Sequence, residues 1–324
     1  MTTAQLLPID AASYEPHPLH ARERTWTETN CYVDLWIEVL HALGLDPIAG
    51  AAFTLSTDFE GDQWTFFKYP PEDLRRLYGL EVSEMNVWRP IVEHVVEQLD
   101  LGRLLTVEVD SWFLPDTAGV SYGIGHTKTT IVPQRIDVEA RRLGYFHNAG
   151  YFELDGDDFD GALRVGTTDP AVLAPYVELI RLERIRRGSD TLVADARSLA
   201  AEHLARRPAD NPMVRFKERL EADVPWLAEQ GLDAFHLYAF GTCRQCGASA
   251  ELAASFVDWL AAHGDAGLEP TAAAFRSVAE AAKGLQFGLA RAARGRAVDL
   301  DTPLAQMARD WDMAIEALVE RYVG

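Results

Sequence analysis

Cysteine is scarce in this chain of 324 residues, which has only Cys31, Cys243 and Cys246. A set that is odd and sparse argues against a disulfide-stapled scaffold. No segment reaches the roughly 18 unbroken apolar residues of a membrane span, and the first residues lack the basic start and apolar stretch of a signal peptide. We therefore expect a cytoplasmic protein, in which a free thiol persists.

Positive charge is also in short supply, because 30 Lys and Arg face 50 Asp and Glu, which gives a net charge of −20. A surface this acidic repels the phosphates of nucleic acids and the head groups of anionic lipids. We expect neither nucleic acid nor a membrane as a partner. Hydrophobic residues at 48% and charged residues at 25% are ordinary for a globular protein.

The chain is longer than one usual domain, and two patterns divide it. The first half mixes helical periodicity with alternating stretches, and it predicts an α+β layout with a helix over 30–43 and strands near 104–109, 126–132, 142–146 and 151–154. From about residue 170 helical periodicity dominates, beginning with a helix over 172–187. We predict an α+β domain over 1–165 and an all-helical domain over 166–324.

Cys31 lies at the first turn of the predicted helix over 30–43, which Thr29 or Asn30 can cap and Gly44 ends. A helix N-terminus carries a partial positive charge and unpaired N–H groups. Both favour a thiolate, so the position predicts a lowered thiol pKa and a nucleophile. The same N–H groups can stabilise an oxyanion. The alternative is a small buried apolar residue.

His126 follows in GIGHTKTTIV, where small neighbours leave room around the imidazole. A cysteine at a helix start, followed about a hundred residues later by a histidine on a strand, is the order of papain-like thiol enzymes. The pattern predicts that His126 is the base. Asp110, at the end of LLTVEVD, orients this histidine or a substrate amine, or else caps a turn.

The third catalytic residue has two candidates. Asn148, in YFHNAGY, is at a suitable separation in sequence, and Asp137 is its rival. His147 is the neighbour of Asn148, and neighbours on a strand point to opposite faces. Only one of the two can therefore face the site.

Cys243 and Cys246 have CxxC spacing, but a structural zinc needs four ligands and no second pair accompanies them. We expect two packed cysteines and no metal. The polar residues Arg244 and Gln245 between them interrupt an apolar stretch and are predicted to face the substrate. Asn30 and Asp137 complete the predicted substrate-binding set.

Four stretches, WTETNCYVDLWIEVLHALGLDP, DSWFLPDTAGVSYGIGHTKTTI, YFHNAGYFEL and YAFGTCRQCGASAELAASFVDWL, resemble the bacterial family DUF1839. That resemblance implies gene clusters with an amino acid:carrier-protein ligase and a small acyl carrier protein. The first half is more distantly similar to the butirosin H group of papain-like acyltransferases. This similarity implies Cys31 as nucleophile, His126 as base and a role for Asp110, whereas Asn148 stands where that group has an aspartate.

The resemblance implies a cysteine-dependent acyl or aminoacyl transferase of natural product biosynthesis. The donor is the phosphopantetheine thioester of an acyl or peptidyl carrier protein, the acceptor is a small-molecule amine, and no cofactor is bound. The alternatives are a cysteine hydrolase (peptidase, amidase or thioesterase) and a non-catalytic module that binds a carrier protein. Carrier proteins are usually acidic, and the best candidate for their docking is the set of arginines at the end of the predicted helix over 172–187: Arg181, Arg184, Arg186 and Arg187. The alternative is a solvated helix end at which these arginines only offset the helix dipole.

Overall fold

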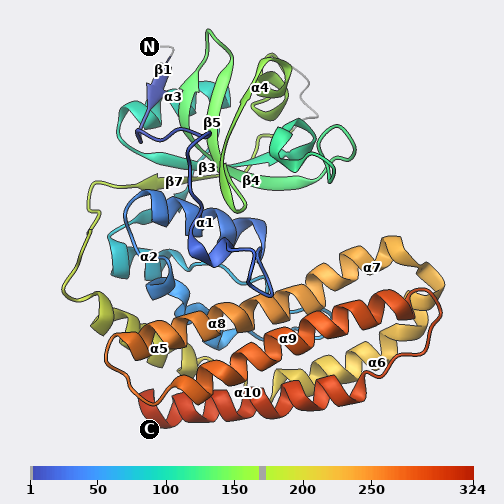
Figure 1. Cartoon of the computed structure of the whole chain (residues 1–324). Coiled ribbons are helices and arrows are strands. Elements are labelled where there is room, and N and C mark those ends of the chain that lie inside the picture. The colour runs from blue at the N-terminus through green and yellow to red at the C-terminus, as the bar shows by residue number, and fades with distance from the viewer. Residues whose placement is uncertain (1–2, 168–172) are drawn as a thin grey trace. The chain divides into compact units, whose positions relative to one another are not determined.

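The computed structural model describes residues 3–167 and 173–324, which form two compact units that interleave along the chain. The sheet unit comprises Met1–Ala21, Asn30–Asp46 and Pro70–Ser189. The helical unit comprises Arg22–Thr29, Pro47–Tyr69 and Asp190–Gly324. The predicted α+β class, with a sheet in the first half and helices in the second, is confirmed (Figure 1).

The described strands of the sheet unit form one antiparallel sheet in the order β2-β7-β3-β4-β5-β6, with β1 beside β4. The long strand β4 joins its two halves. Its first residues pair with β3, and its last residues pair with β1. The strands are β1 (Thr3–Gln5), β2 (Glu81–Glu84), β3 (Leu104–Asp110), β4 (Lys128–Asp137), β5 (Arg142–His147), β6 (Gly150–Asp155) and β7 (Val177–Arg181).

Helix α1 (Cys31–Ala42) packs on β4, β5 and β6. Asn30 caps it by accepting hydrogen bonds from the backbone N–H groups of Tyr32 and Val33, and Gly44 follows its end at a φ of 73°. The predicted apolar face is buried along its whole length. The other elements of the sheet unit are η1 (Pro18–His20), α2 (Pro71–Tyr78), α3 (Ile91–Asp100), η3 (Ser111–Phe113), η4 (Pro115–Thr117) and α4 (Gly156–Ala162).

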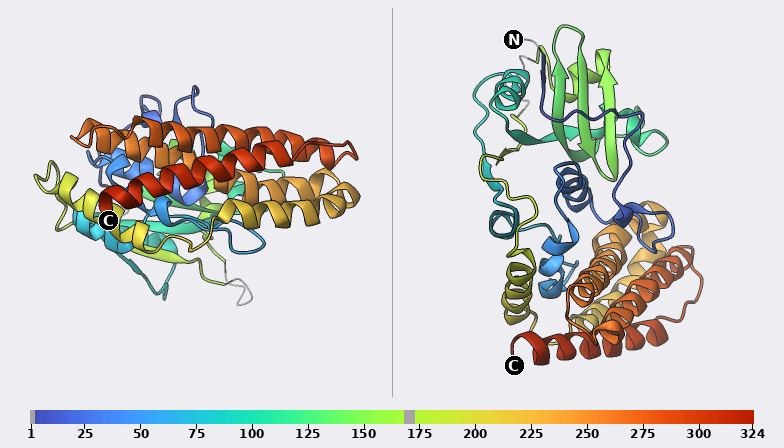
Figure 2. Two further views of the ribbon diagram at one scale, coloured as in Figure 1. Left: turned by 90° about the horizontal axis from the view of Figure 1, so that it is seen from below. Right: turned by 60° about the vertical axis from the view of Figure 1, so that its left-hand side comes forward.

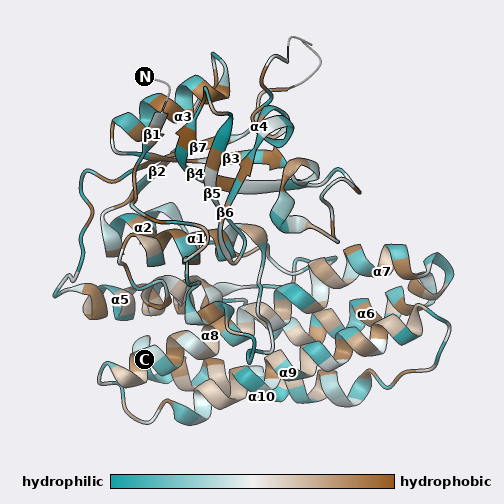
Figure 3. Cartoon of the chain, turned by 45° about the horizontal axis from the view of Figure 1, so that its top comes forward, coloured by the Kyte–Doolittle hydropathy of each residue, from teal (hydrophilic) through white to brown (hydrophobic). Residues whose placement is uncertain are grey.

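The helical unit consists of long amphipathic helices, among which α8, α9 and α10 lie side by side (Figure 2). Hydrophobic and hydrophilic residues alternate along them (Figure 3), and in α9 the buried Phe275, Val278, Leu285 and Leu289 follow the helical period. The elements are η2 (Ile48–Ser56), α5 (Leu192–Ala205), α6 (Pro212–Gln230), α7 (Leu232–Ala239), the π-helix η5 (Phe240–Arg244), α8 (Gln245–Ala262), α9 (Glu269–Ala292) and α10 (Asp301–Tyr322). No helix in the described ranges is both long and apolar enough to cross a membrane.

Two sequence predictions differ from this fold. The helix predicted over 172–187 is wrong, because Val177–Arg181 forms β7 between β2 and β3 and both neighbours supply its backbone hydrogen bonds. Residue 172 lies outside the described residues.

The single domain boundary predicted at residue 165 also differs from the observed division. The sheet unit continues to Ser189, and the earlier segments Arg22–Thr29 and Pro47–Tyr69 belong to the helical unit. In that unit η2 packs on α5 and α8, a long-range contact that composition along the chain does not reveal.

Candidate active site

Cys31 is the first residue of α1 and is half-buried. Oδ1 of the Asn30 side chain accepts hydrogen bonds from the backbone N–H groups of Tyr32 and Val33. The Asn30 carbonyl accepts a hydrogen bond from the backbone N–H of Asp34. Within the described residues the backbone N–H of Cys31 donates to no other residue. The oxyanion-binding group expected at this helix start is therefore reduced to one N–H, because the cap uses the others.

The thiol of Cys31 contacts the first residues of β4. Burial raises the pKa of Cys31. A hydrogen bond that the Thr129 hydroxyl can donate to the thiolate form and the nearby Lys128 ammonium offset part of that rise, and Asp34 adds to it. The lowered pKa predicted from the helix position is wrong, because burial outweighs the local field of the helix start. Cys31 therefore rests as a thiol, and a reaction at its sulfur would require a base.

His126, two residues before β4, donates from Nδ1 to Oδ2 of Asp110 at 2.6 Å. Its ring stacks on Trp112, with ring centres 4.6 Å apart and planes 12° from parallel. Oδ1 of Asp110 accepts from the backbone of Trp112 and Thr127, which fixes the carboxylate. Burial opposes ionisation of Asp110, but the hydrogen bonds from His126 and Trp112 prevail and lower its pKa.

The orienting partner of His126 is thus Asp110, one of the roles that the sequence left open for it. Asn148, predicted as that partner, lies in the tight turn between β5 and β6 at a φ of 44°, a left-handed conformation that asparagine tolerates. Asp137 ends β4 and accepts from the backbone of Ala140. It lies nine residues beyond Lys128 on the strand, about 30 Å away at the usual rise, so it is too far to act at Cys31.

A second histidine–aspartate pair lies at the same end of the sheet. Nδ1 of His147 is 2.6 Å from Oδ2 of Asp116, and Nε2 of His147 is 2.8 Å from the Thr129 hydroxyl. The side chains of His147 and Asp116 are 1% and 3% exposed. Sequence reasoning passed over this pair, although strand alternation required His147 and Asn148 to face opposite ways. His147 is the residue that turns toward Thr129, and hence toward Cys31.

Two family models match the chain: the DUF1839 N-terminal domain over residues 15–182 and the DUF1839 C-terminal domain over residues 189–320. The chain belongs to the DUF1839 family. The matched regions of this DUF1839 chain meet near Ser189, where the sheet unit ends. Comparison with curated proteins gives no match.

Other predicted residues of the DUF1839 chain have structural contacts. Arg244 donates from Nε to the Thr29 carbonyl at 2.8 Å, pairs with Glu28 and lies over the Phe240 ring. Gln245 is buried at the start of α8. Substrate binding by these two residues, and by the capping residue Asn30, stays a prediction.

The two remaining cysteines are packed in the helical unit, as expected. Cys243 and Cys246 are buried and unbridged, and the sulfur of Cys246 lies 3.8 Å from that of Met213. Burial raises the pKa of Cys243 to about 12. Both thiols are therefore inert beside the half-buried Cys31.

The arginines predicted at the end of a helix do not lie on one, because Arg181 ends β7 and the others follow it. Arg181 and Arg184 pair with Glu81. The guanidinium of Arg186 donates to carbonyls of α2, and that of Arg187 donates to the Leu43 carbonyl. The helix predicted to carry these arginines is therefore wrong, whereas docking of a carrier protein on them stays a prediction.

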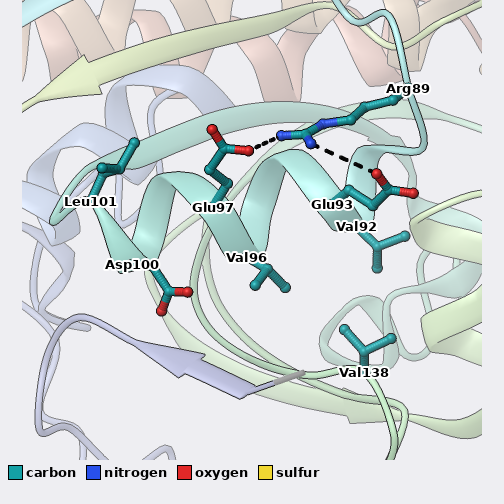
Figure 4. A pocket seen from close by; sticks show the side chains of 8 residues that line it. All are labelled: Arg89, Val92, Glu93, Val96, Glu97, Asp100, Leu101 and Val138. Carbon is teal, nitrogen blue, oxygen red and sulfur yellow. Dashed lines mark hydrogen bonds and ion pairs between the residues drawn. The ribbon is translucent and has the colours of Figure 1, made fainter. Parts of the chain in front are cut away.

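A hollow of about 590 Å³ lies along α3, with Val92, Val96 and Val138 pointing into it and Arg89 paired with Glu93 and Glu97 beside it (Figure 4). None of the residues that line it carries a thiol, a hydroxyl or an imidazole. The candidate site therefore rests on the contacts around Cys31 and not on this hollow.

Proposed function

We propose that this DUF1839 chain is a cytoplasmic, cysteine-dependent acyl or aminoacyl transferase of natural product biosynthesis whose sheet unit is papain-like. The donor is the phosphopantetheine thioester of a carrier protein, and the acceptor is a small-molecule amine. One observation carries the proposal. The helix-start thiol of Cys31 contacts β4 at Thr129, at the end of the sheet where two histidine–aspartate pairs gather.

The chemistry proceeds in two displacements. The Cys31 sulfur, once deprotonated, attacks the thioester carbonyl, and the phosphopantetheine thiolate leaves and takes up a proton. We assign the stabilisation of the oxyanion in this step to the backbone N–H of Cys31. The amine then attacks the acyl-Cys31 carbonyl, loses its proton to a base and releases the Cys31 thiolate.

His126 is the base for the acceptor step. Its side chain is 70% exposed, and its Nδ1–H is held by Asp110, which leaves Nε2 as the acceptor of a proton from an incoming amine. The stacked Trp112 holds the plane of the ring. A base on the solvent side suits a co-substrate that arrives after the acyl-enzyme has formed.

The test is an intact mass spectrum after incubation with an aminoacyl-loaded carrier protein, with and without an amine. The proposal predicts an acyl adduct that disappears when the amine is added, with the acylated amine as product. In Cys31→Ala the adduct must be lost, and the retained Cys243 and Cys246 serve as an internal control for non-specific acylation. An adduct that yields only free acid would identify a hydrolase, and no adduct would leave a carrier-binding module.

A further inference from the structure

The buried pair is connected to the nucleophile by an unbroken series of contacts. Asp116 binds Nδ1 of His147 at 2.6 Å, and Nε2 of His147 is 2.8 Å from the Thr129 hydroxyl. That hydroxyl in turn lies close enough to the Cys31 sulfur to lower the pKa of the thiol. Thr129 is 6% exposed. The three groups behind the thiol are thus shielded from water.

The direction of each hydrogen bond follows from the groups at the far end. Burial and the adjacent Asp116 raise the pKa of Tyr145, so this phenol keeps its proton and donates it to Asp116. The carboxylate of Asp116 only accepts, so His147 carries its proton on Nδ1 and presents Nε2 as an acceptor. The Thr129 hydroxyl donates to Nε2, and its oxygen then accepts from the Cys31 thiol.

We propose that Thr129 relays the proton of Cys31 to His147, which makes the buried His147–Asp116 pair the base that activates the nucleophile and Thr129 its required link. The thiol proton passes to the Thr129 oxygen while the hydroxyl's own proton passes to Nε2. Cys31 becomes a thiolate that accepts from Thr129, and His147 becomes an imidazolium held by Asp116. Cys31, Thr129 and His147 together neither gain nor lose a proton or an electron. This inference rests on the proposed function for its role in acyl transfer.

Charged groups around the site favour the state in which Cys31 is a thiolate and His147 is an imidazolium. Lys128 lies near the thiolate, whereas Asp34 of α1 opposes it. The imidazolium faces Asp116, and Tyr145 behind it is near Asp158 of α4. Negative charge therefore surrounds the position where the positive charge forms, which is the arrangement that stabilises an ion pair in a buried site.

The test uses iodoacetamide, which reacts with the thiolate of Cys31 and requires no acyl donor. Thr129→Val removes the hydroxyl at nearly constant shape, and Thr129→Ser keeps it. Thr130→Val is the matched control, because Thr130 is equally buried but lies on the opposite face of β4. Rates of Cys31 alkylation are measured across pH by peptide mapping, with circular dichroism and thermal unfolding as checks of the fold.

We expect Thr129→Val and His147→Gln to slow alkylation near neutral pH by about tenfold or more, the value of a hydrogen bond to a charged group. Their pH profiles should shift to higher pH, while Thr129→Ser restores most of the rate and Thr130→Val matches wild type. Wild-type rates in folded Thr129→Val, no recovery in Thr129→Ser, or an equal loss in Thr130→Val would each overturn the relay. If Thr129 controls alkylation but no carrier thioester acylates Cys31, the proposed function fails and the relay stands.

Discussion

The histidine–aspartate pairs His126–Asp110 and His147–Asp116 have the same nitrogen–oxygen distance of 2.6 Å but opposite exposure. The side chains of His147 and Asp116 are almost completely buried, whereas those of His126 and Asp110 are 70% and 33% exposed. Water screens the exposed pair, and it has little access to the buried one. The same hydrogen bond therefore orients a ring at the solvent in one place and stabilises a transferred proton in the other.

This difference suggests a division of labour. A thiol whose pKa is raised by burial needs a base that is always in contact with it, and the buried pair meets that need through Thr129. An amine that arrives from solution needs a base that it can reach, and only the exposed pair meets that need. Each prediction below treats the two pairs differently.

The largest expected effect is on acylation of Cys31. His147→Gln should slow acyl-enzyme formation by about 10³-fold, within the usual range for loss of a general base. His94→Gln should acylate at the wild-type rate, because His94 is a buried histidine of α3 that contacts the backbone of Trp88 and not the site. Rapid-quench measurement of the acyl adduct gives both rates, and equal loss in the two variants would contradict the account.

The next effect is on stability. Asp116→Asn should lower the free energy of unfolding by about 3–5 kcal/mol, because it breaks a buried pair. Asp110→Asn should cost no more than about 1 kcal/mol, because its pair is exposed. Urea unfolding compares the two directly, and similar losses would mean that the difference in exposure has no energetic consequence.

A third histidine–carboxylate contact gives a pH test of the same comparison. Hydrogen bonds from His20 to Asp34 and Glu38 outweigh burial and raise the pKa of His20 to about 9. Because the pKa of His20 is higher in the folded state, His20 stabilises the fold fully below its unfolded pKa of 6.5. This contribution to the free energy of unfolding is lost as the pH rises through about 9. The rise of about 2.5 pKa units corresponds to about 3 kcal/mol.

His20→Gln should therefore be less stable than wild type by about that amount near pH 6, and the difference should shrink toward pH 10. The groups that face His20 are Asp34 and Glu38 of α1, with Tyr14 and His17 beside Glu38. Denaturant unfolding across this range is the measurement. A difference that stays constant with pH would show that His20 is not held protonated.

The smallest effect concerns Asp110 in acid. Because His126 and the backbone of Trp112 hold its pKa below the ordinary value, Asp110 stabilises the fold above about pH 4 and loses that contribution as pH falls. The stability difference between wild type and Asp110→Asn should stay under about 1 kcal/mol and narrow between about pH 5 and pH 3. Widening of the difference in acid would contradict the sign of the shift.

Local patterns predicted what depends on local physics. The helix at Cys31, its Asn30 cap and its end at Gly44 follow from apolar periodicity and capping chemistry, and the structure confirms them. The strand predicted over 104–109 is also confirmed, as Leu104–Asp110. The packed Cys243 and Cys246 follow from the helical setting of their motif.

What the sequence missed depends on long-range contacts. Strand β7 exists because β2, about a hundred residues earlier in the chain, and β3, about seventy residues earlier, bond to its two edges. The hydrogen bonds from Asp116 through His147 to Thr129 join η4, β5 and β4, and no residue spacing along the chain predicts them. The raised pKa of Cys31 arises from burial by the rest of the sheet unit, whereas the sequence supplied only the helix start.

The most direct test of the division of labour is the mass of the enzyme shortly after mixing with a carrier thioester and an amine, in His126→Gln and in His147→Gln. The account predicts that acyl-Cys31 accumulates in His126→Gln, because the nucleophile is activated but the amine is not. It predicts that His147→Gln remains unacylated over the same period. Accumulation of the adduct in His147→Gln and its absence in His126→Gln would contradict the account and make the exposed pair the activator of Cys31.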